Sequence, residues 1–372
     1  MKVRRPSAMV LVLFVVHLVA TAAQAASLGA DLPDLTDAFT TLRAKAAASA
    51  EGRVRATHTQ EELDDIVQVE RDASGRLTLR SDCRDLPALL GALADWKTSF
   101  GEAPGAAPDI SRAGAFCSAP IDSIAPALVV RLHGTRTRHS GPNCWNTALL
   151  SARVVLSQRA SEAEEIRFWT HSPLCRELSP QETRLPGDII SVSGPGDSPE
   201  MHAFVYITDK LAFAKNGFDV QWPYELQSLE RQYQIAALGD EIAPAACRRA
   251  VGRPADCNVW ANHYRCAPYA EYVSRAQTPE KDVFLKADLE LTSIERRLSS
   301  IVTSGGWSVE TRFEMESGLR PLEEFVRGRT AAHPGDALWS SLLFRIGSFR
   351  TQFDVLDDEL KKTKVLAHLG GI

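Results

Sequence analysis

The seven cysteines of this 372-residue chain constrain its fold most, because all of them follow an N-terminal segment typical of an export signal. That segment has basic residues in MKVRRPS, an apolar run in AMVLVLFVVHLVA and a small-residue cleavage pattern at Ala23-Gln24-Ala25. We therefore predict that residues 1–25 are a signal peptide and that the mature protein is exported, to the periplasm or the extracellular space. No later segment reaches the roughly 20 apolar residues that span a bilayer, so we expect no membrane contact after cleavage.

Cysteines of an exported protein are expected to pair, and an odd number leaves at least one free thiol. The positions favour one bridge between Cys83 and Cys117. A second bridge is expected between two of the three cysteines that crowd into one loop, Cys247, Cys257 and Cys266. The chain has no CxxC or HExxH pattern, the spacings that typically hold zinc. We therefore predict no metal and no cofactor.

Composition excludes one class of partner and periodicity divides the chain. The net charge of −5 and the pI near 6.0 give no basic field, so we expect no nucleic-acid partner. Residues 28–135 mix helix-like stretches with a hairpin-like pair, residues 136–275 combine one helix-like run with short strands and a cysteine-containing loop, and residues 276–372 are helical. The helical region contains LKADLELTSIERRLSSIV and ALWSSLLFRIGSFRTQFDVLDDELKK, whose apolar residues recur at helical spacing. We predict that these helices pack on the protein itself.

The N-terminal region contains three readable elements. The stretches EELDDIV and LPALLGALADW are helix-like, and VQVERDASGRLTLRS is typical of a β-hairpin that turns at Ala73-Ser74-Gly75. The segment GEAPGAAPD that follows is rich in glycine and proline and predicts a loop.

A cysteine stands where a Gly-Pro loop passes into a helix-like run, in the stretch SGPNCWNTALLSARVVL of residues 140–156. Apolar residues from Trp145 onward recur at helical spacing and Asn143 is a good N-cap, so we predict that Cys144 lies in the first turn of a helix. Free N–H groups and the helix dipole stabilise a thiolate there and lower the pKa of the thiol. Cys144 is therefore the candidate nucleophile, and a buried or disulfide-bonded cysteine is the alternative.

A thiolate nucleophile needs a positioned base, and His202 is the best placed of the nine histidines. A predicted strand from Asp188 to Val192 and a Gly/Pro loop precede it, and it opens the apolar run HAFVYI, which is typical of a buried strand. A histidine at the mouth of such a strand is held rigidly and faces a cleft. His171 has no such strand context, and we interpret it as a loop residue.

The turn after this strand predicts what lies beside the imidazole. If Thr208 and Leu211 close a hairpin, His202 lies opposite Gly217 and diagonally beside Asn216. Cross-strand neighbours of this kind sit roughly 5–8 Å apart, within reach of side chains.

Asn216 is accordingly the candidate for the third residue of a triad. Its amide oxygen would accept the ring N–H that does not face the thiol and would fix the tautomer of the histidine. Lys215 and Asp219 are the rivals for this place, since a slip of one residue in the register exchanges the neighbours. A turn residue before Gly217 is the alternative interpretation of Asn216.

Four motifs in this order carry a resemblance to a known family: NCWNTAL, LPGDIISV, HAFVYI and AFAKNGF. Over residues 135–240 the chain resembles the papain-like cysteine peptidases and amidases of the NlpC type and their CHAP relatives, and PYELQSLERQY is similar to the segment that often closes such domains. The resemblance implies an α+β fold in which an antiparallel sheet packs on the helix that begins at the nucleophile. It also implies a triad of Cys144, His202 and Asn216, and peptidoglycan peptides as the usual substrates.

The resemblance has departures that keep other functions open. The Asp-Cys-Ser-Gly sequence common around the nucleophile of NlpC-type enzymes is replaced by Asn-Cys-Trp-Asn. Transglutaminase-like acyl transferases share the order of cysteine and histidine. The expected function is therefore an exported cysteine hydrolase that cleaves an amide bond in peptidoglycan peptides. A transglutaminase-like acyl transferase and a non-catalytic binding or structural module of the same fold are the alternatives.

Two residues close to the cysteine are the candidates for substrate binding. His139 lies just before Cys144 in RTRHSGPNC, where it and Arg136 and Arg138 would suit an anionic carboxylate of a peptide. Trp145 follows the cysteine. The alternatives are a solvated loop for the three basic residues and a core anchor for the tryptophan.

Overall fold

The computed structural model describes residues 67–195, 200–239 and 243–369, with the side chains of residues 364–369 excepted. The chain divides into two compact units, residues 1–63 and 64–372, and every described residue belongs to the second. The predicted signal peptide, and the helix-like stretch EELDDIV up to residue 66, lie outside the described residues. No helix in the described part of the chain is both long enough and apolar enough to cross a membrane.

The first sheet has four strands and contains the predicted hairpin. Its strand order is β1-β2-β4-β3, all antiparallel, with β1 (Gln68–Arg71), β2 (Leu77–Asp82), β3 (Ser111–Ala113) and β4 (Phe116–Pro120). Helix α4 (Leu86–Ser99) follows the hairpin, where the stretch LPALLGALADW predicts a helix. The hairpin turns at Gly75, whose φ of +85° is a conformation that glycine adopts without strain. Both predictions are confirmed.

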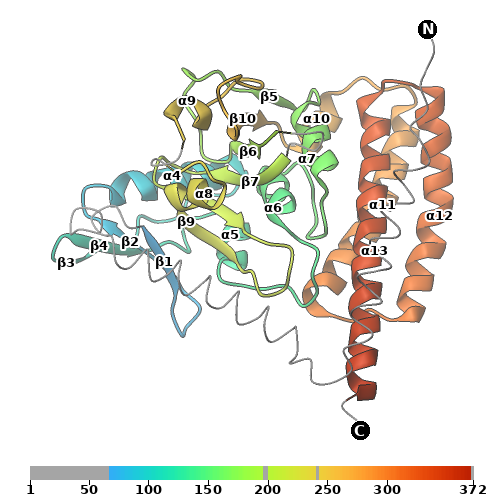
Figure 1. Cartoon of the computed structure of the whole chain (residues 1–372), viewed down its shortest axis with the longest axis horizontal. Helices are drawn as coiled ribbons and strands as arrows, with labels where there is room; N and C mark the ends of the chain where they lie inside the picture. Colours follow the sequence, from blue (N-terminus) through green and yellow to red (C-terminus); the bar gives the residue numbers. More distant parts are fainter. Residues whose placement is uncertain (1–66, 196–199, 240–242, 370–372) are drawn as a thin grey trace, which may run out of the picture. The chain divides into compact units, whose positions relative to one another are not determined.

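The second sheet has six antiparallel strands and positions the candidate site. Its order is β5-β10-β6-β7-β8-β9, and the strands are β5 (Cys175–Glu177), β6 (Ile189–Ser193), β7 (Glu200–Tyr206), β8 (Leu211–Lys215), β9 (Tyr224–Ser228) and β10 (Trp260–Cys266). The helices of this region are α5 (Ala127–Leu132), α6 (Cys144–Ser151), α7 (Ala163–Thr170), α8 (Leu229–Ile235), α9 (Ala245–Arg248) and α10 (Tyr269–Arg275). Helix α6 packs against β7 and β8, and Figure 1 shows it beside β7.

Both faces of this sheet are buried, which explains why its central strands are continuous apolar runs rather than alternating ones. Side chains alternate between the two faces of a strand. Val205 and Phe213 point into the main core, which also contains Leu149 of α6, whereas Phe204 and Ala212 point into a smaller core with α8. The resulting class is α+β with antiparallel sheets, as predicted.

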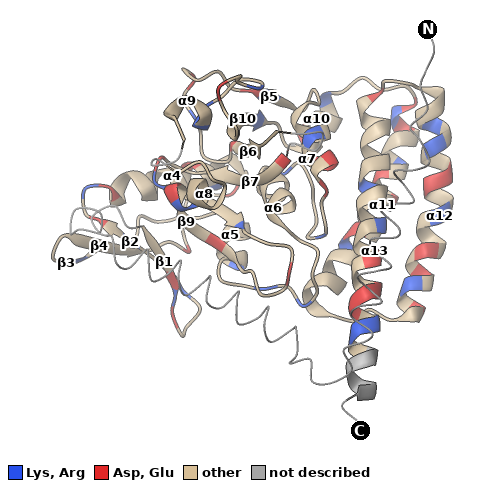
Figure 2. Ribbon diagram, in the orientation of Figure 1, with Lys and Arg blue, Asp and Glu red and all other residues tan. Residues whose placement is uncertain are grey.

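Three long helices follow at the C-terminal end: α11 (Lys281–Ser304), α12 (Val309–Ala332) and α13 (Ala337–Leu369). They lie side by side, and both signs of charge alternate along them (Figures 1 and 2). Leu298, Trp339 and Phe353 are fully buried and belong to the same core cluster as the first sheet and α6. The prediction that these helices pack on the protein itself is confirmed.

A buried ionic network joins these helices to the loop after α6. Glu295 of α11 accepts hydrogen bonds from Ser157 (2.7 Å), Arg159 (3.3 Å) and Arg345 of α13 (2.7 Å). Arg159 also pairs with Glu165 of α7 at 2.6 Å. The four charged side chains are at most 3% exposed. Because buried charges need partners in good geometry, the network fixes how the helical bundle sits on the central sheet.

The six cysteines other than Cys144 form three disulfides, all within the described residues. The bridge from Cys83 to Cys117 is confirmed, and Cys247 pairs with Cys257 inside the predicted loop. Cys266 pairs with Cys175, because the two residues are directly opposite each other in the β5–β10 ladder. Three disulfides are typical of proteins in oxidising compartments, which fits an exported protein.

Candidate active site

Cys144 is the first residue of α6, as predicted, and it is the free cysteine of the described chain. Asn143 caps the helix: its side-chain oxygen accepts a hydrogen bond from the N–H of Asn146 at 3.0 Å, and its amide donates to Ser161 at 2.7 Å. Asn146 is fully buried and donates to the carbonyl of Ser157 at 3.0 Å. The two asparagines around the cysteine therefore anchor the start of the helix to the loop that follows it.

The Cys144 sulfur lies in hydrogen-bonding contact with the His202 side chain. Burial by itself raises the pKa of the Cys144 thiol. His202, through its charge and its hydrogen bond, and the backbone N–H groups of Ala203 and Trp145 lower the pKa by more than burial raises it. The pKa of Cys144 therefore lies below the ordinary value. For His202 the effects have the opposite signs. Burial lowers its pKa, but Cys144 and Gln232 raise it by more, so the pKa of His202 lies above the ordinary value. The two shifts together favour a thiolate–imidazolium pair.

A separation between two strands makes room for the sulfur. Residues 205–206 of β7 pair with residues 212–213 of β8, and in the described chain the ladder does not continue toward the start of β7. Ile207 directs its N–H toward β8, and N–H groups alternate in direction along a strand, so the N–H of Ala203 also points toward β8. It meets the sulfur of Cys144 there instead of a strand partner.

Gln232, rather than Asn216, holds the far side of the imidazole. His202 Nε2 donates to Oε1 of Gln232 at 2.9 Å, which leaves Nδ1 for the sulfur. Gln232 is fully buried on α8, and His202 is 8% exposed. The predicted hydrogen bond from the His202 ring to the Asn216 amide oxygen is wrong, because that oxygen is buried without a hydrogen-bond partner.

The physical reason is the separation of the two strands. The observed register, with Val205 opposite Phe213, differs by one residue from the expected one and would place Asn216 opposite His202, but the paired part of β7 and β8 ends at Val205, before it reaches His202. The rival Lys215 is fully buried and interacts electrostatically with Cys144. The rival Asp219 contributes a backbone carbonyl, which accepts a hydrogen bond from the Lys215 ammonium at 3.0 Å.

The two predicted substrate-binding residues have protein partners. His139 Nδ1 lies 2.8 Å from a carboxylate oxygen of Glu359 on α13. Trp145 is half-buried and packs against the main core, which fits the core-anchor alternative. Both residues flank the cysteine, so their part in substrate binding stays a prediction.

Helix α13 holds the loop that leads to the nucleophile. Glu359 accepts the N–H of Ser140 at 2.9 Å, and Gln352 donates to the carbonyl of Ser140 at 2.9 Å. Gln352 also accepts the N–H of Ala160 at 2.7 Å. Gly141 has a φ of +137°, which favours glycine, and a Cβ there would lie 1.9 Å from the Gln352 oxygen, so a larger residue would displace this side chain. The sequence motifs give no signal for this contact, because it joins residues more than 200 positions apart.

Exposed apolar side chains gather in the segments that surround the cysteine and histidine. Met201 precedes His202, and three more lie in the loop between β8 and β9, namely Phe218, Val220 and Trp222. This loop is tied to the loop before Cys144, because Gly141 donates to the carbonyl of Phe218 at 3.1 Å. Exposed apolar clusters of this kind commonly mark binding surfaces.

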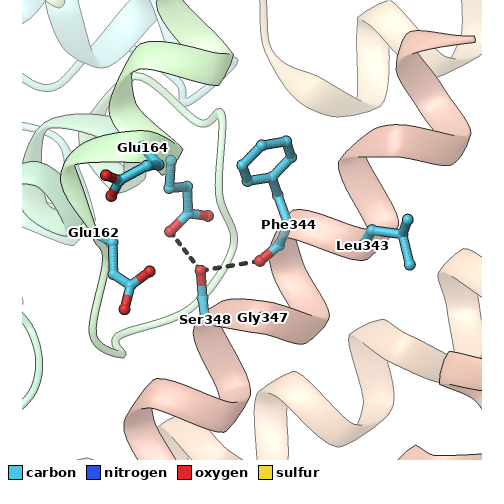
Figure 3. Close-up of a pocket in the computed structure, with 7 residues that line it drawn as sticks. Glu162, Glu164, Leu343, Phe344, Gly347 and Ser348 are labelled. Atoms are coloured by element: carbon cyan, nitrogen blue, oxygen red, sulfur yellow. Dashed lines mark hydrogen bonds between the residues drawn. The ribbon is translucent and has the colours of Figure 1, made fainter. Parts of the chain in front are cut away.

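A pocket of about 370 Å³ lies elsewhere, between α7 and α13. Figure 3 shows Glu162 and Glu164 on one side of it and Leu343, Phe344 and Ser348 on the other. The carboxylate of Glu165, which also lines it, accepts from Ser348 at 2.8 Å and pairs with Arg159. The pocket belongs to the packing of the bundle on the central region, and it contains none of the predicted site residues.

Comparison with family models, with curated proteins and with solved structures finds no match to this chain. The described residues contain no cluster of three or more histidine, cysteine, aspartate or glutamate side chains arranged to hold a metal ion. The chemistry that the site can perform therefore follows from the contacts among Cys144, His202 and Gln232.

Replacing Gln232 by leucine tests its part in the site. The change removes the acceptor for His202 Nε2 and leaves the ring free to rotate, so we expect the alkylation rate of Cys144 at pH 6.5 to fall by about tenfold to a hundredfold. Asn216→Leu is the matched control and should change the rate less than twofold. A larger loss from the asparagine variant than from the glutamine variant would return Asn216 to the third place.

Proposed function

We propose that this protein is an exported cysteine hydrolase of papain-like fold that cleaves an amide bond through Cys144, His202 and Gln232. The observation that carries the proposal is a hydrogen-bonded series that begins at the Cys144 sulfur, at the start of α6, and runs through the His202 imidazole to the Gln232 amide. The state of the cysteines supports it, because Cys144 alone of the seven is left free to react. A disulfide at Cys144 would have been the signature of a non-catalytic module.

The proposed reaction has two steps. The Cys144 thiolate attacks the amide carbonyl, the backbone N–H of Cys144 at the start of α6 stabilises the oxyanion, and the C–N bond breaks as His202 gives its proton to the leaving amine. A thioester remains. His202 then takes a proton from water, the hydroxide adds to the thioester carbonyl, and the C–S bond breaks to release the acid and restore the thiolate and imidazolium. The balance is one water consumed for each amide bond cleaved.

The proposed substrates are peptidoglycan peptides, a choice that rests on the resemblance and on the expected compartment. The exposed apolar side chains of Met201, Phe218 and Trp222 suit a substrate with an apolar group beside the scissile bond.

Alkylation and product analysis test the proposal. Iodoacetamide should label the oxidised native protein at Cys144 alone, with a pH midpoint below the roughly 8.5 of a free cysteine, and purified peptidoglycan should release new peptide ends that a Cys144→Ala variant does not produce. Mass spectrometry reads both results. A midpoint at or above 8.5 would contradict an activated cysteine, and cross-linked rather than cleaved peptides would favour the transglutaminase-like acyl transferase.

A further inference from the structure

Lys215 is a fully buried lysine next to the proposed nucleophile, and the proposed reaction does not use it. Its ammonium donates to the carbonyl oxygens of Gly217 at 2.6 Å and Asp219 at 3.0 Å. The Asp219 carboxylate and the Cys144 sulfur also act on it electrostatically. Because a buried cation is costly without counter-charges, the Cys144 thiolate is an anion that its position favours.

The pleat of β8 directs Lys215 toward that anion. Leu211 and Phe213, two and four residues earlier on the strand, point into the main core on the side of α6, and Lys215 shares their face. It is the last residue of β8, at the end where this strand has separated from β7 and where Cys144 begins α6. Lys215 and Cys144 interact electrostatically across this gap.

Resting on the proposed function, we propose that Lys215 is a positioning residue, a second positive charge that stabilises the Cys144 thiolate in addition to His202. The thiolate would then keep a counter-charge whenever the imidazole is neutral. The loop that carries Gly217 and Asp219 serves as the cradle that holds the ammonium in place through its carbonyl groups.

The charged and titratable groups around the lysine agree with this role. Burial lowers the pKa of Lys215 to about 8, against the opposing effects of Asp219 and Cys144, so the ammonium is charged through the acid and neutral range. Across the ladder on β9 lies Tyr224, whose pKa burial raises, so it stays neutral. His202 on β7 is the other cation near the sulfur. Asp219 and Cys144 are thus the two acidic groups that interact with the lysine charge, and Cys144 is the one of them in the proposed active site.

The test measures thiol ionisation and requires no substrate. Iodoacetamide labelling of Cys144 between pH 4 and 10 is followed in the native protein, in Lys215→Met, in His202→Ala and in the double variant. We expect Lys215→Met to raise the labelling midpoint by about one pH unit, and to raise it again when added to His202→Ala. Lys210→Met is the matched control, since it removes a lysine at the other end of β8 and should leave the midpoint unchanged.

The outcomes separate this proposal from the proposed function. A native midpoint below 8.5 that Lys215→Met leaves unchanged overturns the role of the lysine alone. A native midpoint at or above 8.5 overturns the activated cysteine itself. Should Lys215→Met only loosen the loop, protease would cut near residues 216–223 while the midpoint stays in place, which again counts against the electrostatic role.

Discussion

A His202→Ala variant is expected to lose about 10³-fold in turnover of a cleavable peptide while it keeps its fold. General acid–base catalysis contributes roughly 10²–10⁴-fold, and the alanine removes both the proton donor for the leaving amine and the hydrogen-bonded cation beside the sulfur. The direction of the pH effect follows from the coupled pair. Because His202 lowers the pKa of Cys144, its loss should move the labelling midpoint upward.

His171→Ala is the control for this experiment. His171 ends α7, and its Nδ1 lies 2.9 Å from the carbonyl of Arg167 rather than near the sulfur. We expect its replacement to change turnover and labelling less than twofold. If His171→Ala abolished labelling and His202→Ala did not, the assignment of the base would be wrong.

The parts of the site that follow from local signals are predictable from the sequence. An asparagine cap before an apolar run at helical spacing is enough to place Cys144 at the start of α6, and an apolar run bounded by a Gly/Pro loop is enough to place His202 at a strand. An odd number of cysteines in an exported chain predicts a free thiol. Each of these inferences depends on residues that are close together in the chain.

The third residue of the site is not predictable by the same means. Gln232 lies 30 residues after His202 and reaches it only because α8 packs on the face of the sheet that carries Phe204. One signal was present: Gln232 and Tyr233 lie three and four residues after Leu229, and all three are buried on α8. A polar residue on an otherwise apolar helix face needs a buried hydrogen-bond partner, and His202 is the partner that the structure provides.

The helical bundle shows the same division. The sequence predicts α11 and α13 from their apolar repeats, but not α12, which contains Pro321 inside the helix. Charged residues on a helix are usually expected at the surface, yet Glu295 and Arg345 in the bundle are only 1% and 2% exposed. Their burial depends on Arg159, more than 130 residues earlier, and no local pattern predicts that pairing.

Removing the central carboxylate of this network should destabilise the protein strongly. Burial raises the pKa of Glu295, but Arg345 and Arg159 lower it by more, so the carboxylate stays ionised and pairs with both guanidinium groups. A Glu295→Ala variant leaves these two cations short of a partner in the core. Breaking a buried ion pair typically costs 3–5 kcal/mol, so we expect the free energy of unfolding in urea to fall by about 4 kcal/mol.

Two further variants identify the cause of that loss. Glu314→Ala removes the carboxylate of an exposed pair with Arg297, whose side chains are more than half exposed, and should cost less than about 1 kcal/mol. Glu295→Gln keeps a hydrogen-bond acceptor for Ser157 and removes only the charge, so a loss close to that of the alanine variant would assign the effect to electrostatics. If Glu295→Ala cost no more than the exposed control, the network would not be what fastens the bundle to the central sheet.

Because Gln352 and Glu359 on that bundle hold the loop before Cys144, the destabilised variant should also label more slowly at its cysteine, which links the stability of the helices to the reactivity of the thiol.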